Sequence, residues 1–331
     1  MLDPKKAHVV SQWKHTTPLN ACRYDGLGKF VFCGSEDNLV ERFSLKDGKR
    51  VDFKGGHETW VRGLAATPDG TQVVSGGCEG NLTWWNVVDD KGTMVRKVAA
   101  HQGWIRSVDI SKDGKWVASG GNDNVVRIWN AADGKLVHEI KNHARHVYNV
   151  TFHPDSTSVF TGDLMGKVCQ TEVGKWELKK EFDAKDLHTY HKGQQTDFGG
   201  VRGIAINPEK KLIATGGTYK ASNPFGAIHE PLVLLFNAVS GKLEKKLVAE
   251  GIKRGVIWRL VWLNAETLCG VCGGGDGGFL IFWNLKAEKD FHRFKLPNLA
   301  RDMDLHPDGL HVATAHYDRQ VRITRLAAKK A

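Results

Sequence analysis

The chain has few cysteines and no long apolar run. Six cysteines in 331 residues are too sparse for the disulfide framework of a small secreted scaffold, and they fit a reducing compartment. No stretch approaches the roughly 20 apolar residues of a membrane-spanning helix, and the first residues, MLDPKKAHVVSQWK, lack the apolar core of a secretory signal. We therefore expect a cytoplasmic protein, or a nuclear one if the source is a eukaryote.

Acidic residues are also in deficit. Lys and Arg number 47 against 37 Asp and Glu, which leaves a formal net charge of +10. Such an excess favours acidic partners, whether nucleic acid, an anionic surface or an acidic protein segment. The basic residues are spread along the chain, as on an ordinary solvated surface. Because 41% of the residues are hydrophobic, a large core is expected and a disordered chain is excluded.

What the sequence has in abundance is repetition. The clearest copy follows His101 and reads WIRSVDISKDG, KWVASGGND and NVVRIWNAADGK. In four copies a histidine stands 18 residues before the small residue that ends the second apolar run, as His101 does before Ser119. These small residues recur at intervals of 42, 44, 42, 54, 57 and 42, at Cys33, Ser75, Ser119, Thr161, Thr215, Cys272 and Thr314. The chain therefore contains seven copies of one unit.

Each copy alternates apolar and polar residues over short runs bounded by Gly, Asp, Asn or Pro. This pattern predicts antiparallel strands joined by tight turns. A period in the low forties, with a His near the start, Ser-Gly before a turn and Trp in the third run, resembles the WD-repeat family. The resemblance covers essentially the whole chain. It implies an all-β fold, a seven-bladed β-propeller of four-stranded antiparallel blades.

The repeats divide one domain, residues 1–331, into seven blades. We expect blade 1 at 15–54, blade 2 at 55–99, blade 3 at 100–141, blade 4 at 142–184, blade 5 at 185–249 with insertions, blade 6 at 250–297 and blade 7 at 298–331. The last blade has sequence for only three strands. Residues 1–14 precede His15 as an outer strand precedes His143, so we predict that they complete blade 7, close the ring and cover its open edge.

The resemblance also implies a structural hydrogen-bond chain within each blade. In the family a His, a Ser or Thr, an Asp and a Trp form it. The matching residues are His101, Ser119, Asp123 and Trp129 in blade 3, and His57, Ser75 and Trp85 in blade 2, where Glu79 replaces Asp. Other blades depart from the pattern. Blade 4 has Met165 and Thr171 at the acid and aromatic positions, and blade 7 keeps Thr314 and Asp318 but lacks the His and Trp.

Family geometry places the start of each first strand at the upper rim of the central channel. Equivalent positions there are Asn20, Arg62, Arg106, Tyr148, Arg202, Trp258 and Arg301, and two residues earlier Pro18, Trp60, Trp104, His146, Gly200, Val256 and Leu299. Arg and aromatic residues are enriched in binding hot spots, and Arg binds carboxylate or phosphate with two parallel hydrogen bonds. We expect the partner-binding residues to be Trp60, Arg62, Trp104, Arg106, His146, Tyr148, Arg202, Trp258 and Arg301. The alternative is that arginine is simply common at this position of WD repeats and has no binding role.

Blade 5 carries two insertions, residues 185–200 and 218–231, which should both lie on the upper face. Long loops on a regular scaffold are often functional, and the alternative is a packed lid without a partner. His188, His191 and Asp197 in the first insertion are the one place where an acid–base or metal cluster is considered.

Two further motifs are set aside. Cys269 and Cys272 have the spacing of a redox or metal pair, but residues three apart on a strand point to opposite faces. The glycine-rich stretch 273–278 has no following Gly-Lys-Ser or Gly-Lys-Thr and predicts a turn, not a phosphate loop. We expect no cofactor, no metal site and no catalytic residue.

Together these observations favour a non-catalytic scaffold or adaptor that binds an acidic or phosphorylated segment of another protein on its upper face. It would act as a monomeric propeller within a larger complex, with no membrane partner. The alternative is a nucleic-acid-associated subunit that binds RNA or DNA, which the charge of +10 and the aromatic residues support. An enzyme using the blade 5 histidines is the third hypothesis.

Overall fold

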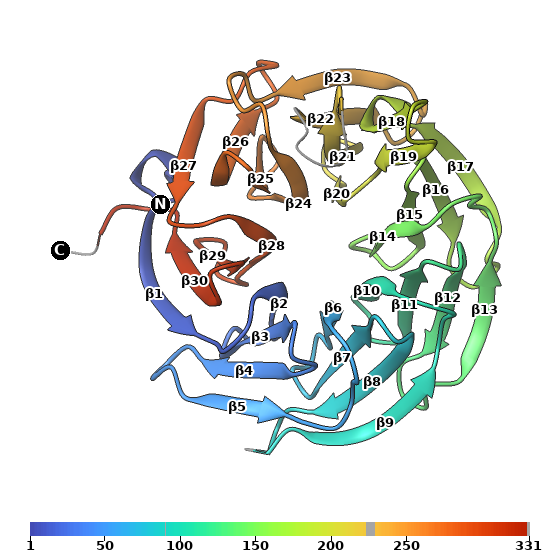
Figure 1. Ribbon diagram of the computed structural model, residues 1–331, viewed down its shortest axis with the longest axis vertical. Helices are drawn as coiled ribbons and strands as arrows, with labels where there is room; N and C mark the ends of the chain where they lie inside the picture. Colours follow the sequence, from blue (N-terminus) through green and yellow to red (C-terminus); the bar gives the residue numbers. More distant parts are fainter. Residues whose placement is uncertain (90, 223–228, 330–331) are drawn as a thin grey trace.

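The computed structural model describes residues 1–89, 91–222 and 229–329. Seven four-stranded antiparallel sheets are arranged as blades around a central channel (Figure 1). Within the described ranges, helix is limited to two short 3-10 turns, Pro4–Lys6 and Lys185–Leu187. None of the helices there is long and apolar enough to cross a membrane. The predicted all-β, seven-bladed propeller is therefore confirmed.

The strands of each blade follow one another outward from the channel. Blade 1 has β2 (Leu19–Tyr24), β3 (Phe30–Ser35), β4 (Val40–Ser44) and β5 (Arg50–Phe53). Blade 2 has β6 (Val61–Ala66), β7 (Gln72–Gly77), β8 (Asn81–Asn86) and β9 (Thr93–Ala99). Blade 3 has β10 (Ile105–Ile110), β11 (Trp116–Gly121), β12 (Val126–Asn130) and β13 (Leu136–Ile140). Blade 4 has β14 (Val147–Phe152), β15 (Ser158–Asp163), β16 (Lys167–Glu172) and β17 (Leu178–Asp183).

The remaining blades are less regular in length. Blade 5 has β20 (Gly203–Asn207), β21 (Leu212–Tyr219), β22 (Glu230–Asn237) and β23 (Leu243–Val248), preceded by a separate hairpin of β18 (His188–His191) and β19 (Thr196–Gly199). Blade 6 has β24 (Val256–Trp262), β25 (Thr267–Gly274), β26 (Gly277–Asn284) and β27 (His292–Leu296). Blade 7 has β28 (Ala300–Leu305), β29 (His311–His316) and β30 (Gln320–Arg325). We call the face at which the innermost strands begin the upper face.

The two ends of the chain meet in one sheet. Strand β1 (His8–Lys14) pairs antiparallel with β30, so the sheet order is β1-β30-β29-β28 (Figure 1). The indole of Trp13 stacks on Phe43 of blade 1, with ring centroids 5.8 Å apart. The N-terminal strand thus contacts both blade 7 and blade 1.

Apolar side chains fill the space between neighbouring blades. Trp84 of blade 2 lies in one buried cluster with Ile105 and Trp129 of blade 3. Trp283 of blade 6 packs in the same way with Val233 of blade 5. Each such side chain contributes about 1.5–3 kcal/mol through burial. The core is therefore a ring of interblade layers, and it holds the innermost strands rigidly around the channel.

Candidate binding site at the channel mouth

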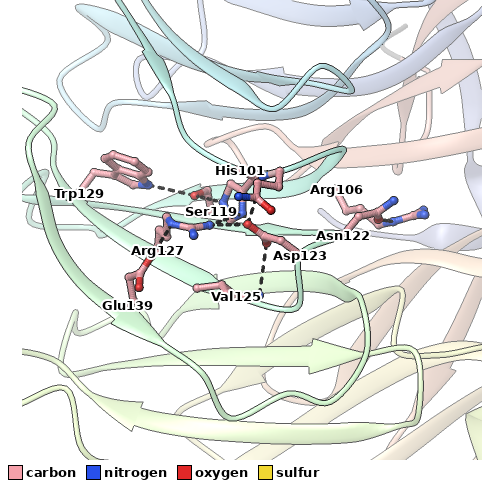
Figure 2. Close-up of polar contacts among 10 residues, drawn as sticks. His101, Arg106, Ser119, Asn122, Asp123, Val125, Arg127, Trp129 and Glu139 are labelled. Carbon is pink, nitrogen blue, oxygen red and sulfur yellow. Dashed lines mark hydrogen bonds and ion pairs between the residues drawn. The ribbon is translucent and has the colours of Figure 1, made fainter.

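Hydrogen-bonded side chains tie the strands of blade 3 together (Figure 2). His101 lies 2.9 Å from Asp123 through Nδ1 and 2.7 Å from Ser119 Oγ through Nε2. The indole N–H of Trp129 donates to the same Ser119 oxygen at 2.9 Å. Although burial acts to raise the pKa of Asp123, hydrogen bonds from His101 and Arg127 outweigh it and hold that pKa far below its usual value. The four residues that the resemblance assigned to blade 3 therefore form one chain of hydrogen bonds, from Trp129 through Ser119 and His101 to Asp123.

Blade 2 repeats this arrangement with a longer acid. His57 contacts Glu79 Oε1 at 2.6 Å and Ser75 Oγ at 2.6 Å, and Trp85 donates to Ser75 at 2.7 Å. All four polar heads are buried or nearly so. These contacts pair buried polar groups within one blade, which is a structural role.

From the sequence, blades 4 and 7 seemed to lack a member of the hydrogen-bond chain. In the structure a residue at an unexpected position takes that place in each blade. In blade 4 the acid is Asp163, whose Oδ2 lies 2.9 Å from His143 Nδ1, and not residue 165. In blade 7 the histidine is His316, whose Nε2 lies 2.7 Å from Thr314 Oγ1. Both residues come two positions after the small residue of the second strand. Residues two apart on a strand share a face, so both point toward the same buried network.

The predicted rim residues sit at a recurring irregularity of the innermost strands. The pairing register between first and second strands shifts by one residue at Asn20, Arg62, Arg106, Tyr148, Trp258 and Arg301. Arg202 stands directly before β20, and its N–H donates to Gly216 O at 2.8 Å. A β-bulge leaves one residue unpaired and re-aims its side chain. The bulges explain how one side chain per blade is turned into the channel entrance.

These seven side chains line a single cavity at the upper end of the channel, which we call the mouth. Its free volume is about 70 Å³, and Arg23, Arg259 and Asp302 lie among the deeper lining residues. Asp302 accepts from Arg23 at 2.6 Å and from Arg259 at 3.0 Å. The two deeper arginines therefore share one carboxylate.

Guanidinium groups and aromatic rings alternate around much of the mouth. Arg106 lies 5.0 Å from the ring centroid of Trp104 and 4.5 Å from that of Tyr148. Arg202 lies 3.9 Å from Tyr148 and 5.4 Å from Trp258. Cation–π contacts of this kind orient an arginine without using up its hydrogen-bond donors. Apart from the Arg106 Nε–H, which donates to Asn122 at 2.6 Å, these contacts leave the guanidinium donors available to a ligand.

Three of the mouth arginines have no carboxylate partner. Among the described residues, no Asp or Glu lies within ion-pair distance of Arg62, Arg106 or Arg202; Arg106 donates to the neutral Asn122 oxygen at 2.6 Å. Burial, together with the repulsion of Arg202 and Arg62, lowers the pKa of Arg106 to about 10. Burial and neighbouring arginines likewise lower the pKa of Arg62. Within the part of the chain that the structure describes, the Nε of Arg202 and the Nδ2 of the buried Asn20 are donors without a partner.

The opposite side of the mouth is neutralised. Arg301 donates to Glu36 and to Asn20, and its guanidinium lies 4.8 Å from the ring of Tyr317. The uncompensated positive charge is therefore confined to the side formed by blades 2, 3 and 5.

Residues at the tip between second and third strands were not predicted, although a signal for them exists. They stand three positions after the recurring small residue: Glu36, Cys78, Asn122 and Tyr317 are examples. The backbone N–H groups of these four residues bond to the carbonyls of Pro18, Trp60, Trp104 and Leu299. The same seven-fold spacing that locates the mouth arginines would have found their neighbours.

Aromatic side chains stand just outside the mouth. Trp60 and Trp104 precede β6 and β10, are 39% and 37% exposed, and their ring centroids are 6.4 Å apart. The rings of His146 and Tyr148 have centroids 6.5 Å apart. Burial and, to a smaller extent, repulsion from Arg106 lower the pKa of His146. All nine predicted partner-binding residues thus lie in or next to the mouth.

The insertions of blade 5 are only partly described. Residues 185–200 form the β18–β19 hairpin, in which His188 Nε2 lies 2.9 Å from Asp197 Oδ1. His191 instead faces Thr196 across the hairpin, so the three candidate residues do not form one cluster. Of the second insertion, 218–231, residues 223–228 lie outside the described residues.

The two motifs set aside from the sequence have simple places in blade 6. Cys269 and Cys272 are buried free thiols in different core clusters, one on each face of the sheet. Burial raises the pKa of Cys272 to about 12. The glycine-rich stretch spans the hairpin between β25 and β26.

Comparison with known proteins gives one family. The model described as WD domain, G-beta repeat matches residues 48–86, 92–130 and 134–167. No curated protein matches the chain.

Proposed function

Since this chain is a WD-repeat β-propeller, we propose that it is a protein-interaction scaffold whose mouth binds an acidic or phosphorylated segment of another protein. Propellers of this family generally serve as interaction scaffolds and are typically non-catalytic. We infer the chemistry of the partner from the side chains of the mouth.

One observation carries the proposal: Arg62, Arg106 and Arg202 converge on one cavity without a carboxylate partner. Each guanidinium offers a fork of donors that matches carboxylate and phosphate oxygens. Burial and mutual repulsion make this arrangement costly to the fold, because the charged form is disfavoured. Local features that lower the stability of the fold, and that no compensating contact within the fold explains, are typical of functional sites.

The nucleic-acid alternative has less support from this geometry. Proteins that bind single strands use a positively charged groove that follows several phosphates, with aromatic residues along it. Here the unpaired arginines point into one cavity of about 70 Å³.

Fluorescence anisotropy with a labelled peptide of alternating Glu and Gly, and with its Gln counterpart, tests the proposal. The full chain should bind the Glu peptide and not the Gln peptide, with affinity that falls as salt increases. Arg62→Gln, Arg106→Gln and Arg202→Gln should each lower the affinity by roughly 10- to 100-fold, because a hydrogen bond to a charged group contributes about 1.5–3 kcal/mol.

Arg293→Gln is the matched control, since Arg293 already pairs with Asp290 on the outer strand of blade 6. It should bind the Glu peptide like the unmodified chain. Equal binding of the Glu and Gln peptides, or full affinity in all three mouth variants, would refute an anion-binding mouth.

A further inference from the structure

We infer that the mouth recognises a two-residue signature: an anionic side chain held in the cavity and, next to it in the same segment, a bulky apolar side chain packed on Trp60 and Trp104. This inference rests on the proposed function and names the class of peptide. The anionic group is a carboxylate or a phosphate, since the same guanidinium donors bind both.

The two tryptophans form an apolar shelf, defined as Trp60 and Trp104, beside the charged side of the mouth. More than a third of each side chain is exposed, although large aromatic residues usually bury their surface. Trp104 also lies 5.5 Å from Arg62 and 5.0 Å from Arg106, measured from ring centroid to guanidinium carbon. An anion held by these arginines therefore lies within one residue's reach of the shelf.

Other directions out of the mouth offer a poorer surface to an acidic segment. Toward blades 7 and 1, the carboxylate of Glu36 already occupies Arg301. Toward blades 4 and 5 stands the β18–β19 hairpin, whose Asp197 is already engaged by His188 at 2.9 Å and by Arg145 at 3.7 Å. The exposed rings beside Arg62 and Arg106 thus direct an acidic segment across blades 2 and 3.

Trp60 is the half of the shelf that is separate from the arginines: it contacts Trp104, and among the described residues no arginine lies over its ring, whereas Arg62 and Arg106 both lie over Trp104. Truncation of Trp60 should therefore remove packing surface without moving the guanidinium groups. Because an aromatic pair stabilises a contact beyond the area it buries, the adjacent phenylalanine should increase affinity by up to about tenfold, which is about 1.4 kcal/mol.

Competition anisotropy against the labelled Glu peptide measures this increment with four capped peptides: Gly-Glu-Phe-Gly, Gly-Glu-Ala-Gly, Gly-Gln-Phe-Gly and Gly-phosphoserine-Phe-Gly. The unmodified chain should prefer the Glu-Phe over the Glu-Ala peptide about tenfold, and Trp60→Ala should reduce that ratio to near one. Trp176→Ala is the matched control: Trp176 also pairs with another tryptophan, Trp116, at 5.5 Å, but does not line the mouth. It should keep the tenfold ratio.

The outcomes separate the two levels of the proposal. Binding of Glu peptides with equal affinity for Phe and Ala, or a ratio that Trp60→Ala leaves intact, overturns the signature while the anion-binding mouth stands. Loss of all preference for Glu over Gln overturns both. Stronger competition by the phosphoserine peptide assigns the anion to phosphate, and stronger competition by Glu-Phe assigns it to carboxylate. A single-stranded oligothymidylate is tested as a further competitor. If it outcompetes every peptide and binds Trp60→Ala more weakly, the partner is a nucleic acid and the peptide signature is overturned.

Discussion

Replacing Arg106 with methionine should stabilise the fold. Methionine keeps the apolar stem and removes the charge that burial and the neighbouring arginines disfavour. Most substitutions in a folded protein do the opposite and lower the free energy of unfolding by about 1 kcal/mol. An increase at a partly buried polar position therefore requires a specific cause.

The magnitude follows from three contributions. The fall in the pKa of Arg106 from 12.5 to about 10 corresponds to about 3 kcal/mol of destabilisation of the charged form. The substitution also loses the hydrogen bond to Asn122, worth about 1.5 kcal/mol, and the contacts with Trp104 and Tyr148, worth about 1 kcal/mol together in this partly exposed setting. The net expectation is a gain of less than about 1 kcal/mol.

Chemical denaturation followed by tryptophan fluorescence measures the change as a shift of the midpoint. The matched variant is Arg127→Met in the same blade, where the guanidinium pairs with Asp123 at 2.6 Å and Glu139 at 2.8 Å. It should lose about 2 kcal/mol, because two partly buried carboxylates lose their partner. Sulfate should stabilise the unmodified chain more than Arg106→Met, since an anion relieves the repulsion. If Arg106→Met is destabilised as much as Arg127→Met, the mouth is not under electrostatic strain.

Three further predictions concern the scaffold. Ser119→Ala leaves a buried indole N–H and an imidazole nitrogen unpaired and should lower the free energy of unfolding by about 2–4 kcal/mol. Ser240→Ala, at an exposed position, should change it by less than about 0.5 kcal/mol, and equal denaturation midpoints of the two variants would contradict the role of the hydrogen-bond chain. Burial and then Arg322 lower the pKa of His316 from 6.5 to about 4, so protonation of this histidine costs the folded state about 3 kcal/mol, a cost that is absent above pH 6.5 and grows as the pH falls to 4. Denaturation midpoints across this window should be flatter in His316→Gln, and an unchanged profile would argue against it. Deletion of residues 1–14 removes β1 and exposes the edge of β30, so the shortened chain should aggregate; a soluble product that melts with the full chain would disprove this role.

The architecture could be predicted from the sequence, because each blade repeats the same strand and turn pattern and the repeats number seven. The mouth was located by family geometry at the equivalent positions of each repeat. The bulges themselves were not predicted, because the shift at Arg62 or Arg106 depends on how two strands pair and leaves no mark in composition.

Departures from the repeat were harder to interpret than its regular copies. The acid of blade 4 and the histidine of blade 7 were sought at fixed offsets, but any residue on the same strand face can enter the network. In blade 3 the corresponding position is Gly121, where a Cβ would lie 2.8 Å from His101 Nδ1. That proximity is the reason why Asp163 and His316 can join the network from this position.

The most direct test of an anion-binding mouth is nuclear magnetic resonance of the arginine Nε–H groups while the alternating Glu-Gly peptide is added. We expect the signals of Arg62, Arg106 and Arg202 to shift together and saturate at one peptide per chain, while those of Arg127 and Arg293 stay in place. Saturable peptide binding that leaves the three mouth signals unmoved would contradict the proposed function.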